Sequence, residues 1–200
     1  MQFTKRDVEI LKFINQFGFC EITQIEKQFV LKQARCYQIL KRLKKANLVA
    51  HEKVFHGRGG ALYLTKVGAD FTDLPAIKNI PKDNYVHQIT IIETYIKLMK
   101  GFPGSQWLTE RHIARDKSEY GVGRKIRHLG DGILILPNNR EIAIEVELTM
   151  KSKRRLDDIM LGYALHKHIK EVWYFCSPII IERVRKAAKN WSHIKIFELD

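Results

Sequence analysis

The sequence predicts an α/β protein of two domains, and three observations lead to this prediction. Three helical stretches and a glycine-tipped hairpin pattern occupy residues 1–75. The next stretch, DLPAIKNIPKDN, holds two of the five prolines and no helical period, so residues 76–84 are predicted to be a linker. Residues 85–200 then follow the order α-β-β-β-α-β, continued by a helix and a strand, and such alternation implies parallel strand pairing.

The first two helices are marked by a cap signal and by apolar spacing. Thr4 and Asp7 have the T-x-x-D spacing of a helix N-terminus. Apolar residues then recur at helical spacing until Gly18 interrupts them. A second, short helix is predicted over residues 22–29.

The third helix lies in LKQARCYQILKRLKKANLV, with Ile39, Leu40 and Leu43 on its core face. After it, apolar and polar residues alternate on both sides of residues 57–60, Gly-Arg-Gly-Gly, which is typical of a β-hairpin. Three short helices followed by a hairpin predict a winged helix-turn-helix domain.

The other face of the third helix is polar and basic. In a winged helix-turn-helix the third helix enters the major groove and the hairpin reaches phosphate, so double-stranded DNA is the expected partner. The residues predicted to contact it are Lys32, Gln33, Arg35, Gln38, Lys41, Arg42 and Lys45 on the helix and Arg58 at the hairpin tip. The other interpretation is a winged helix used for protein contacts, with a basic face that is merely solvated.

The charge of the chain fits a polyanionic partner. The formal net charge is +13 and the pI is about 9.7. Residues 1–75 hold 13 basic and 7 acidic residues, and the remainder holds 22 and 15, so both halves share the excess. Nucleic acid is the usual partner of such a chain; an acidic membrane surface and a simple solubility charge are the alternatives.

Cellular location is predicted from what the sequence lacks. The three cysteines are far apart and have no C-x-x-C spacing, as expected of reduced thiols. The N-terminal residues do not resemble a signal peptide, and no apolar run is long enough for a membrane span. A cytoplasmic protein is the expectation.

The second half is predicted element by element. Its first helix covers residues 85–100, and its strands and later helices are separated by polar turns. The predicted strands are 106–113, 132–136, 142–148, 172–176 and 194–199, and the helices are 152–168 and 179–191. Tyr163 continues an apolar stripe of its helix, so core packing is preferred for it over a nucleophile.

Three acids are predicted to meet on two neighbouring strands. Glu145 and Glu147 are two residues apart, so they point to the same side of a strand. Asp131 begins the preceding strand, which pairs with theirs through the PNNRE turn. Three oxygen ligands at one sheet end suit Mg²⁺ or Mn²⁺, which serves phosphodiester cleavage. The alternative is an exposed edge strand whose surface acids pair with nearby lysines.

These residues resemble the signature of the PD-(D/E)XK nucleases, the restriction-endonuclease-like fold. Asp131 matches the motif Asp and Glu145 the motif Glu, while Glu147 stands where the family usually has Lys. The resemblance leaves open whether Glu147 is a base or a metal ligand, and whether Lys151 or Lys153 replaces the lysine to hold the scissile phosphate. More loosely, Glu93 falls where several members carry an additional acid.

A winged helix followed by HLGD…EVELTMKSKRR resembles the plasmid replication-relaxation proteins and the related MOBC-type relaxases. The resemblance implies a metal-dependent endonuclease that nicks one strand of plasmid DNA at an origin during mobilisation or conjugation, with other mobilisation proteins as partners. It makes His128 a site residue, as proton carrier or phosphate ligand; a histidine hydrogen-bonded in a turn is the alternative.

Two questions stay open at the level of the sequence. The polar stretch 115–130 either orders on DNA through Arg124, Lys125 and Arg127 or forms a flexible connection. The protein as a whole is either the nicking enzyme, a non-catalytic DNA-binding accessory factor, or a transcription regulator whose second domain senses a ligand or mediates dimerisation. The oligomeric state is not predicted.

Overall fold

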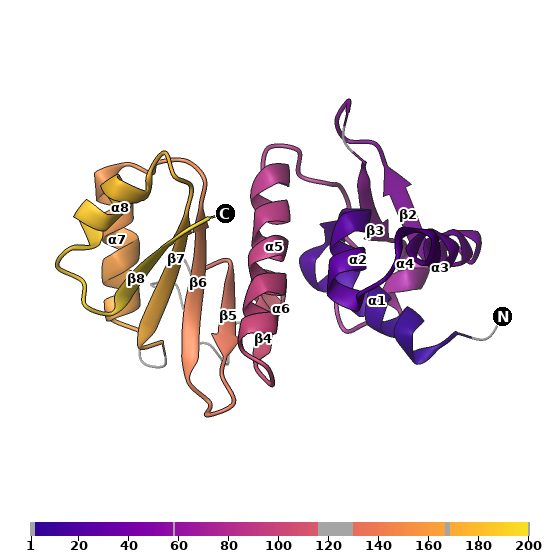
Figure 1. Cartoon of the computed structure of the whole chain (residues 1–200), viewed down its shortest axis with the longest axis horizontal. Coiled ribbons are helices and arrows are strands. Elements are labelled where there is room, and N and C mark those ends of the chain that lie inside the picture. Colours follow the sequence, from indigo (N-terminus) through magenta and orange to yellow (C-terminus); the bar gives the residue numbers. More distant parts are fainter. Residues whose placement is uncertain (1–2, 58, 116–129, 167–168, 200) are drawn as a thin grey trace. The chain divides into compact units, whose positions relative to one another are not determined.

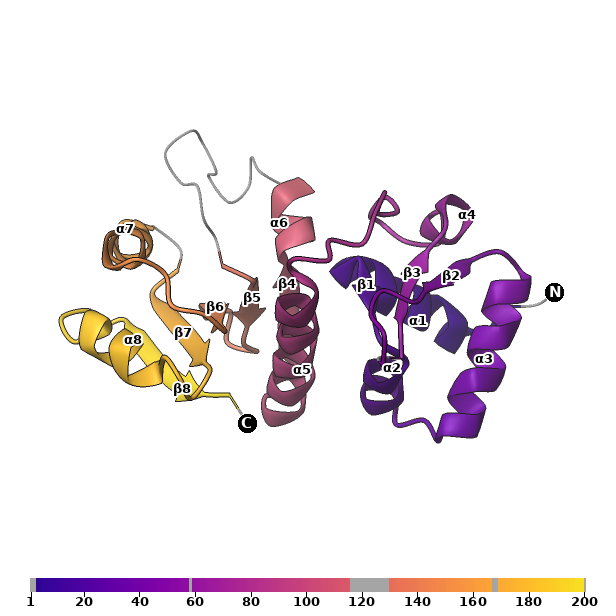
Figure 2. The ribbon, with the colours of Figure 1, turned by 90° about the horizontal axis from the view of Figure 1, so that it is seen from above.

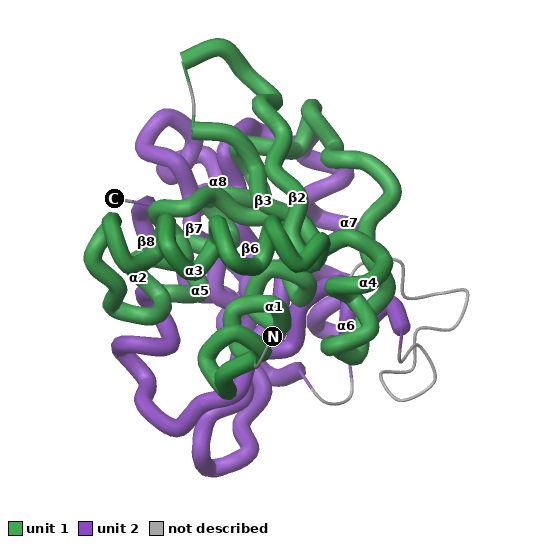
Figure 3. The backbone as a smooth tube through the Cα atoms, turned by 90° about the vertical axis from the view of Figure 1, so that its right-hand side faces the viewer, with its two compact units in different colours: residues 1–96 green, residues 97–200 purple. Residues whose placement is uncertain are grey.

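The computed structural model describes residues 3–57, 59–115, 130–166 and 169–199. The chain is a mixed α/β protein that divides into two compact units, Met1–Ile96 and Lys97–Asp200 (Figure 3). The division falls within helix α5 (Tyr85–Gly101). The sequence placed the boundary earlier, over residues 76–84, because prolines interrupt the helical pattern there, whereas Tyr85 at the start of α5 packs into the first unit.

Unit 1 contains three main helices and a three-stranded sheet (Figure 1). Its elements are α1 (Lys5–Phe17), β1 (Phe19–Cys20), α2 (Ile22–Phe29), α3 (Gln33–Lys45), β2 (Val49–Glu52), β3 (Ala61–Leu64) and α4 (Lys66–Ala69). The strand order is β1-β3-β2, and both pairs are antiparallel. The predicted three helices and hairpin are therefore confirmed as elements, while β1 and α4 are additions.

Helix α1 begins where the cap signal predicted. The Thr4 backbone N–H donates to the Asp7 carboxylate at 2.8 Å, and the Asp7 N–H donates to the Thr4 hydroxyl at 3.2 Å. This reciprocal pair satisfies two of the backbone donors that a helix N-terminus leaves open. The helix ends at Gly18, whose φ of 83° favours glycine.

An aromatic cluster fixes the base of α5 and the β2–β3 loop within unit 1. Tyr85 is fully buried and stacks on Phe19, with ring centroids 5.1 Å apart. Phe55, from the β2–β3 loop, packs edge-on against Tyr85 at 5.2 Å. The Tyr85 hydroxyl donates to Glu21 at 3.0 Å. The loop is thus anchored by packing on one side.

Unit 2 is a five-stranded sheet of order β4-β5-β6-β7-β8. Its elements are β4 (Gln106–Thr109), α6 (Glu110–Arg115), β5 (Gly132–Ile135), β6 (Glu141–Glu147), α7 (Lys153–Ala164), β7 (Glu171–Cys176), α8 (Ile181–Ala188) and β8 (Ile194–Glu198). The pairs β4–β5 and β5–β6 are antiparallel, and β6–β7 and β7–β8 are parallel. The predicted turn between β5 and β6 and the parallel strands after it are confirmed.

One predicted strand is wrong in its second half. The strand expected over residues 106–113 ends at Thr109, and residues 110–115 form α6. The Thr109 hydroxyl accepts a bond from the His112 N–H at 3.3 Å, in the manner of a helix cap, and so ends the strand. Ile113 is buried from a helix instead of a strand. In the sequence, a short strand followed by one buried residue of a helix has the same apolar pattern as a longer strand.

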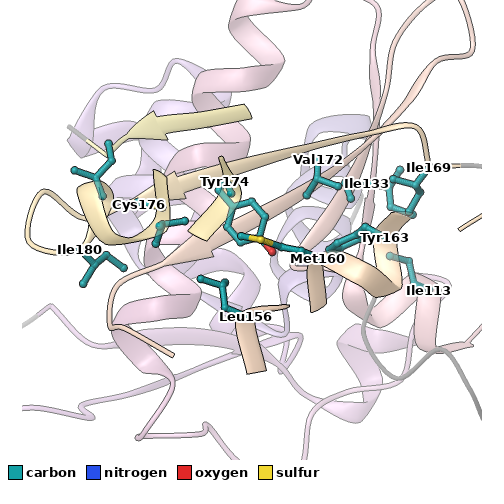
Figure 4. Packing of buried hydrophobic residues seen from close by; sticks show 14 residues of the cluster. Ile113, Ile133, Leu156, Met160, Tyr163, Ile169, Val172, Tyr174, Cys176 and Ile180 are labelled. Carbon is teal, nitrogen blue, oxygen red and sulfur yellow. The ribbon is translucent and has the colours of Figure 1, made fainter. Parts of the chain in front are cut away.

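Helices α7 and α8 lie on the same side of the unit 2 sheet (Figure 2). Leu156, Met160 and Tyr163 of α7 pack there against Tyr174 and Cys176 of β7 (Figure 4). The opposite face of β6 is also covered, since Ile142 and Ile144 are fully buried. The strand that carries the two glutamates is therefore buried on both faces and is neither half-buried nor an exposed edge strand.

Candidate functional site

Helix α3 is anchored by one face and leaves the other open. Cys36, Ile39, Leu40 and Leu43 are each at most 3% exposed, which confirms the predicted core face. Most of the predicted DNA-contacting side chains lie in the exposed class, namely Lys32, Gln33, Arg35, Gln38, Lys41 and Lys45. A rigid helix that presents cations and amides at i, i+3 and i+4 spacing can meet phosphates and base edges together.

Arg42 differs from the other basic residues of α3. Its guanidinium pairs with Asp7, whose carboxylate is fully buried at the start of α1. Burial raises the pKa of Asp7, but the hydrogen bonds from Thr4 and Arg42 outweigh it and hold that pKa below its ordinary value. Arg42 therefore fastens α3 to α1, a contact that helical spacing alone could not reveal.

Two residues of α3 were missed by the sequence interpretation. Tyr37 is 51% exposed although aromatic, and Lys44, two turns further along the helix, is half-buried. Both line a pocket of about 390 Å³ against Ile22 at the start of α2. Their i, i+7 spacing along α3 was the available signal, because residues two turns apart lie on nearly the same side of a helix.

The hairpin that follows α3 is built as predicted up to its tip. Gly57 and Gly60 have φ values of 79° and 84°, which favour glycine. His51 and the Gly59 carbonyl are joined by a 2.9 Å hydrogen bond across the hairpin. The predicted contacts Arg58, Arg124, Lys125, Arg127 and the predicted site residue His128 lie outside the described residues.

The three predicted acids do come together in unit 2. The Asp131 N–H donates to the Ile144 carbonyl at 2.9 Å, and its carboxylate accepts the Val146 N–H at 2.6 Å. Asp131 is therefore bonded to the residues on both sides of Glu145. Glu145 and Glu147 are only 1% and 4% exposed and lie on the sheet face that α7 and α8 cover.

The two glutamates are engaged by neighbouring side chains. The Tyr163 hydroxyl donates to Glu145 at 2.5 Å. Glu147 forms an ion pair with Lys151, four residues further along the chain. Lys153 is exposed in the first turn of α7. An ammonium beside two buried carboxylates offsets their charge, so this cluster supplies its own counter-ion.

Burial shapes the protonation of this cluster. It lowers the pKa of Lys151, and the nearby Glu145 and Asp131 carboxylates oppose that shift. Burial also raises the pKa of Tyr163 well above its usual value, and the Glu145 carboxylate adds to the rise. Tyr163 is therefore held as a neutral hydrogen-bond donor. Its predicted core position is confirmed; its bond to Glu145 was not foreseen.

This arrangement requires glycine at position 130, so a substitution there tests the packing directly. Its φ is 77°, and a Cβ there would lie 2.7 Å from the Tyr163 hydroxyl and 2.8 Å from the Ile144 carbonyl. Gly130→Ala is expected to lower the free energy of unfolding by about 2 kcal/mol, from the strained φ and the overlap. Urea denaturation measures this. Gly101→Ala, which meets open space, is the control; equal stability of both variants would contradict the packing.

No described contact connects Glu93 to this cluster. Its carboxylate pairs with Lys27 of α2 at 2.7 Å within unit 1. Both side chains are well exposed, at 37% and 54%, so the pair adds little to stability. Glu93 thus connects α5 to α2.

Comparison with known proteins gives little likeness. No protein-family model and no curated protein matches the chain. A solved structure described as an O-methyltransferase family protein from Burkholderia thailandensis matches at 10% identity and a TM-score of 0.25. The match covers 98% of this chain and 59% of the length of that one. A likeness this low supports no conclusion about fold or activity.

The predicted metal-dependent nicking activity is wrong. Among the residues that the structure describes, no group of three His, Cys, Asp or Glu side chains could hold a metal ion. The reason lies in the contacts, because Val146, Tyr163 and Lys151 occupy the carboxylates that were assigned to Mg²⁺ or Mn²⁺. The endonuclease and plasmid-mobilisation functions depended on this metal site and are withdrawn with it, while the family resemblance stays a prediction.

Within the described part of the chain, no helix combines the length and the apolar character needed to cross a bilayer.

Proposed function

We propose that unit 1 is a winged helix-turn-helix domain that binds double-stranded DNA through α3. The observation that carries this proposal is the two-sided character of the helix. One face is locked into the core, and the other exposes the six polar or basic side chains named above. Such a helix needs no rearrangement to enter a major groove, which is wide enough to admit it.

The rest of unit 1 supports the same proposal. The β2–β3 hairpin follows α3 directly in the chain, and its loop is anchored to Tyr85 through Phe55. Residues 1–75 carry a net charge of +6 (13 − 7), which favours association with a polyanion. In this arrangement α3 reads base edges while the hairpin reaches the phosphate backbone.

For unit 2 we propose an architectural role. Two antiparallel pairs followed by two parallel pairs, with α7 and α8 on one face, support the restriction-endonuclease-like architecture expected from the sequence. The resemblance to the replication-relaxation proteins stays a prediction. The cluster of Asp131, Glu145, Glu147 and Lys151 joins the segment before β5 to β6, and Tyr163 of α7 bonds to its Glu145.

A single substitution tests the proposed interface. Lys41→Ala removes one exposed cation from the centre of α3. Loss of one phosphate contact is expected to weaken binding about 8-fold at about 0.1 M salt and to reduce the slope of log affinity against log salt by about 0.9. Fluorescence anisotropy of the full chain with a labelled duplex measures both quantities.

The matched control is Lys12→Ala, which removes an equally exposed lysine from α1. It is expected to leave affinity and salt slope close to those of the unmodified protein. Equal losses for the two variants would mean that charge alone, and not α3, attracts DNA. Absence of any binding by the unmodified protein would reject the proposed function.

A further inference from the structure

A pocket opens along the exposed side of α3, beside the residues assigned to DNA. It has a volume of about 390 Å³ and is lined by Ile22, Tyr37, Gln38, Leu40, Lys41 and Lys44. This volume falls within the range of about 300–1,000 Å³ of small-molecule sites. It is larger than a single ion needs, so a ligand with a sizeable body fits it better.

The chemistry of the lining divides into two parts. Ile22, Leu40 and the ring of Tyr37 supply apolar surface, and Tyr37 is half exposed and flat. Lys41 and Lys44 are three residues apart on α3, close enough for both ammonium groups to reach one anion. Gln38 adds an amide that both donates and accepts.

No described residue neutralises the two ammonium groups. Within the described residues, neither Lys41 nor Lys44 has an ion pair or a hydrogen-bond partner. Partial burial lowers the pKa of Lys44, because the charged ammonium loses hydration there. The pocket lining contains no acid that would compensate for this loss. An anionic group at this position would offset it.

We propose that this pocket binds a nucleotide, with the base against Tyr37 and the phosphate between Lys41 and Lys44. Aromatic side chains provide stacking platforms for any base, and lysine is a common phosphate ligand. The nucleotide is either a free mononucleotide or an unpaired nucleotide of the DNA that α3 contacts. The second source rests on the proposed function, whereas the first is independent of it.

A base inside a duplex is stacked on both faces and cannot lie on Tyr37. Moving a base out of the stack costs a few kcal/mol, and least where it is already unpaired. If DNA is the source, a duplex with one unpaired nucleotide is therefore expected to bind more tightly than the fully paired duplex. This preference separates the pocket from ordinary backbone contacts by α3.

The experiment uses the full chain and three probes. Binding of thymidine monophosphate is measured by isothermal titration calorimetry. Two labelled duplexes, one fully paired and one with a single unpaired thymidine, are compared by anisotropy. Tyr37→Ala and Lys44→Met are the test variants, and both positions are exposed enough to be changed without removing core volume. Lys12→Met is the matched control, because Lys12 is an exposed lysine of α1 that lies outside both the pocket lining and the residues assigned to DNA.

Each result decides between the sources or rejects the pocket. Saturable binding of the mononucleotide that both test variants weaken at least 10-fold, and the control does not, supports the free ligand, even if no duplex binds. An unpaired-nucleotide preference that only the test variants abolish supports the DNA source. Equal loss for both duplexes, or no effect on any probe, would overturn the inference while leaving DNA binding by α3 to its own test.

Discussion

Reversing the charge of both Lys41 and Lys45 to glutamate is expected to reduce DNA affinity about 1,000-fold. Both side chains are exposed and lie one turn apart on α3. Losing two phosphate contacts accounts for about 60-fold at about 0.1 M salt, and repulsion between the new carboxylates and the phosphates supplies the remainder. Anisotropy with a labelled duplex over a range of salt concentrations measures the effect.

The control for this variant has the same net charge. Lys5→Glu with Lys12→Glu reverses two exposed lysines of α1. General electrostatic attraction falls equally in the two double variants, so only a difference between them reports contact by α3. If the control variant bound DNA as weakly as the α3 variant, α3 would not be the helix that contacts DNA. Circular dichroism should show unchanged helix content in both.

Asp7→Ala is expected to cost about 3 kcal/mol of folding free energy in unit 1. Asp7 is fully buried, accepts the Thr4 N–H and pairs with Arg42. Removing it opens the cap of α1, worth about 1 kcal/mol, and leaves the half-exposed guanidinium of α3 without its carboxylate. Urea denaturation measures the loss, and Asp7→Asn, which keeps an acceptor but not the charge, should lose less.

The acid dependence of stability provides a second signature of Asp7. Since the folded-state pKa lies below the ordinary value of 3.8, the stabilisation by Asp7 is complete above that value and is lost as pH falls through the lower, folded pKa. Asp7→Asn should therefore flatten the stability curve below about pH 4. A curve as steep as that of the unmodified protein would show that other carboxylates dominate acid unfolding.

The parts of the fold that depend on local sequence patterns could be predicted from the sequence. The T-x-x-D signal placed the start of α1, and helical spacing identified Ile39, Leu40 and Leu43 as the buried face of α3. Alternation and the PNNRE turn predicted the β5–β6 pair. Each of these features depends on residues a few positions apart, so no knowledge of the tertiary arrangement was needed.

The chemistry of the site depends on contacts that the sequence does not display. Glu-x-Glu on a strand suggested an open polar face, but α7 covers that face and its Tyr163 bonds to Glu145. Arg42 shares the periodicity of the DNA-facing residues, yet a partner 35 positions away draws it into a structural ion pair. Burial and long-range pairing thus turned candidate functional charges into internal ones.

The most direct measurement is the map of amide chemical-shift changes when a duplex is added to the ¹⁵N-labelled full chain. Binding through α3 is expected to shift the amides of Lys32 to Lys45 and of the β2–β3 hairpin, while α1 amides that face away stay in place. Changes confined to other elements, or no changes at a DNA concentration that saturates anisotropy, would contradict the assignment of α3 as the element that contacts DNA.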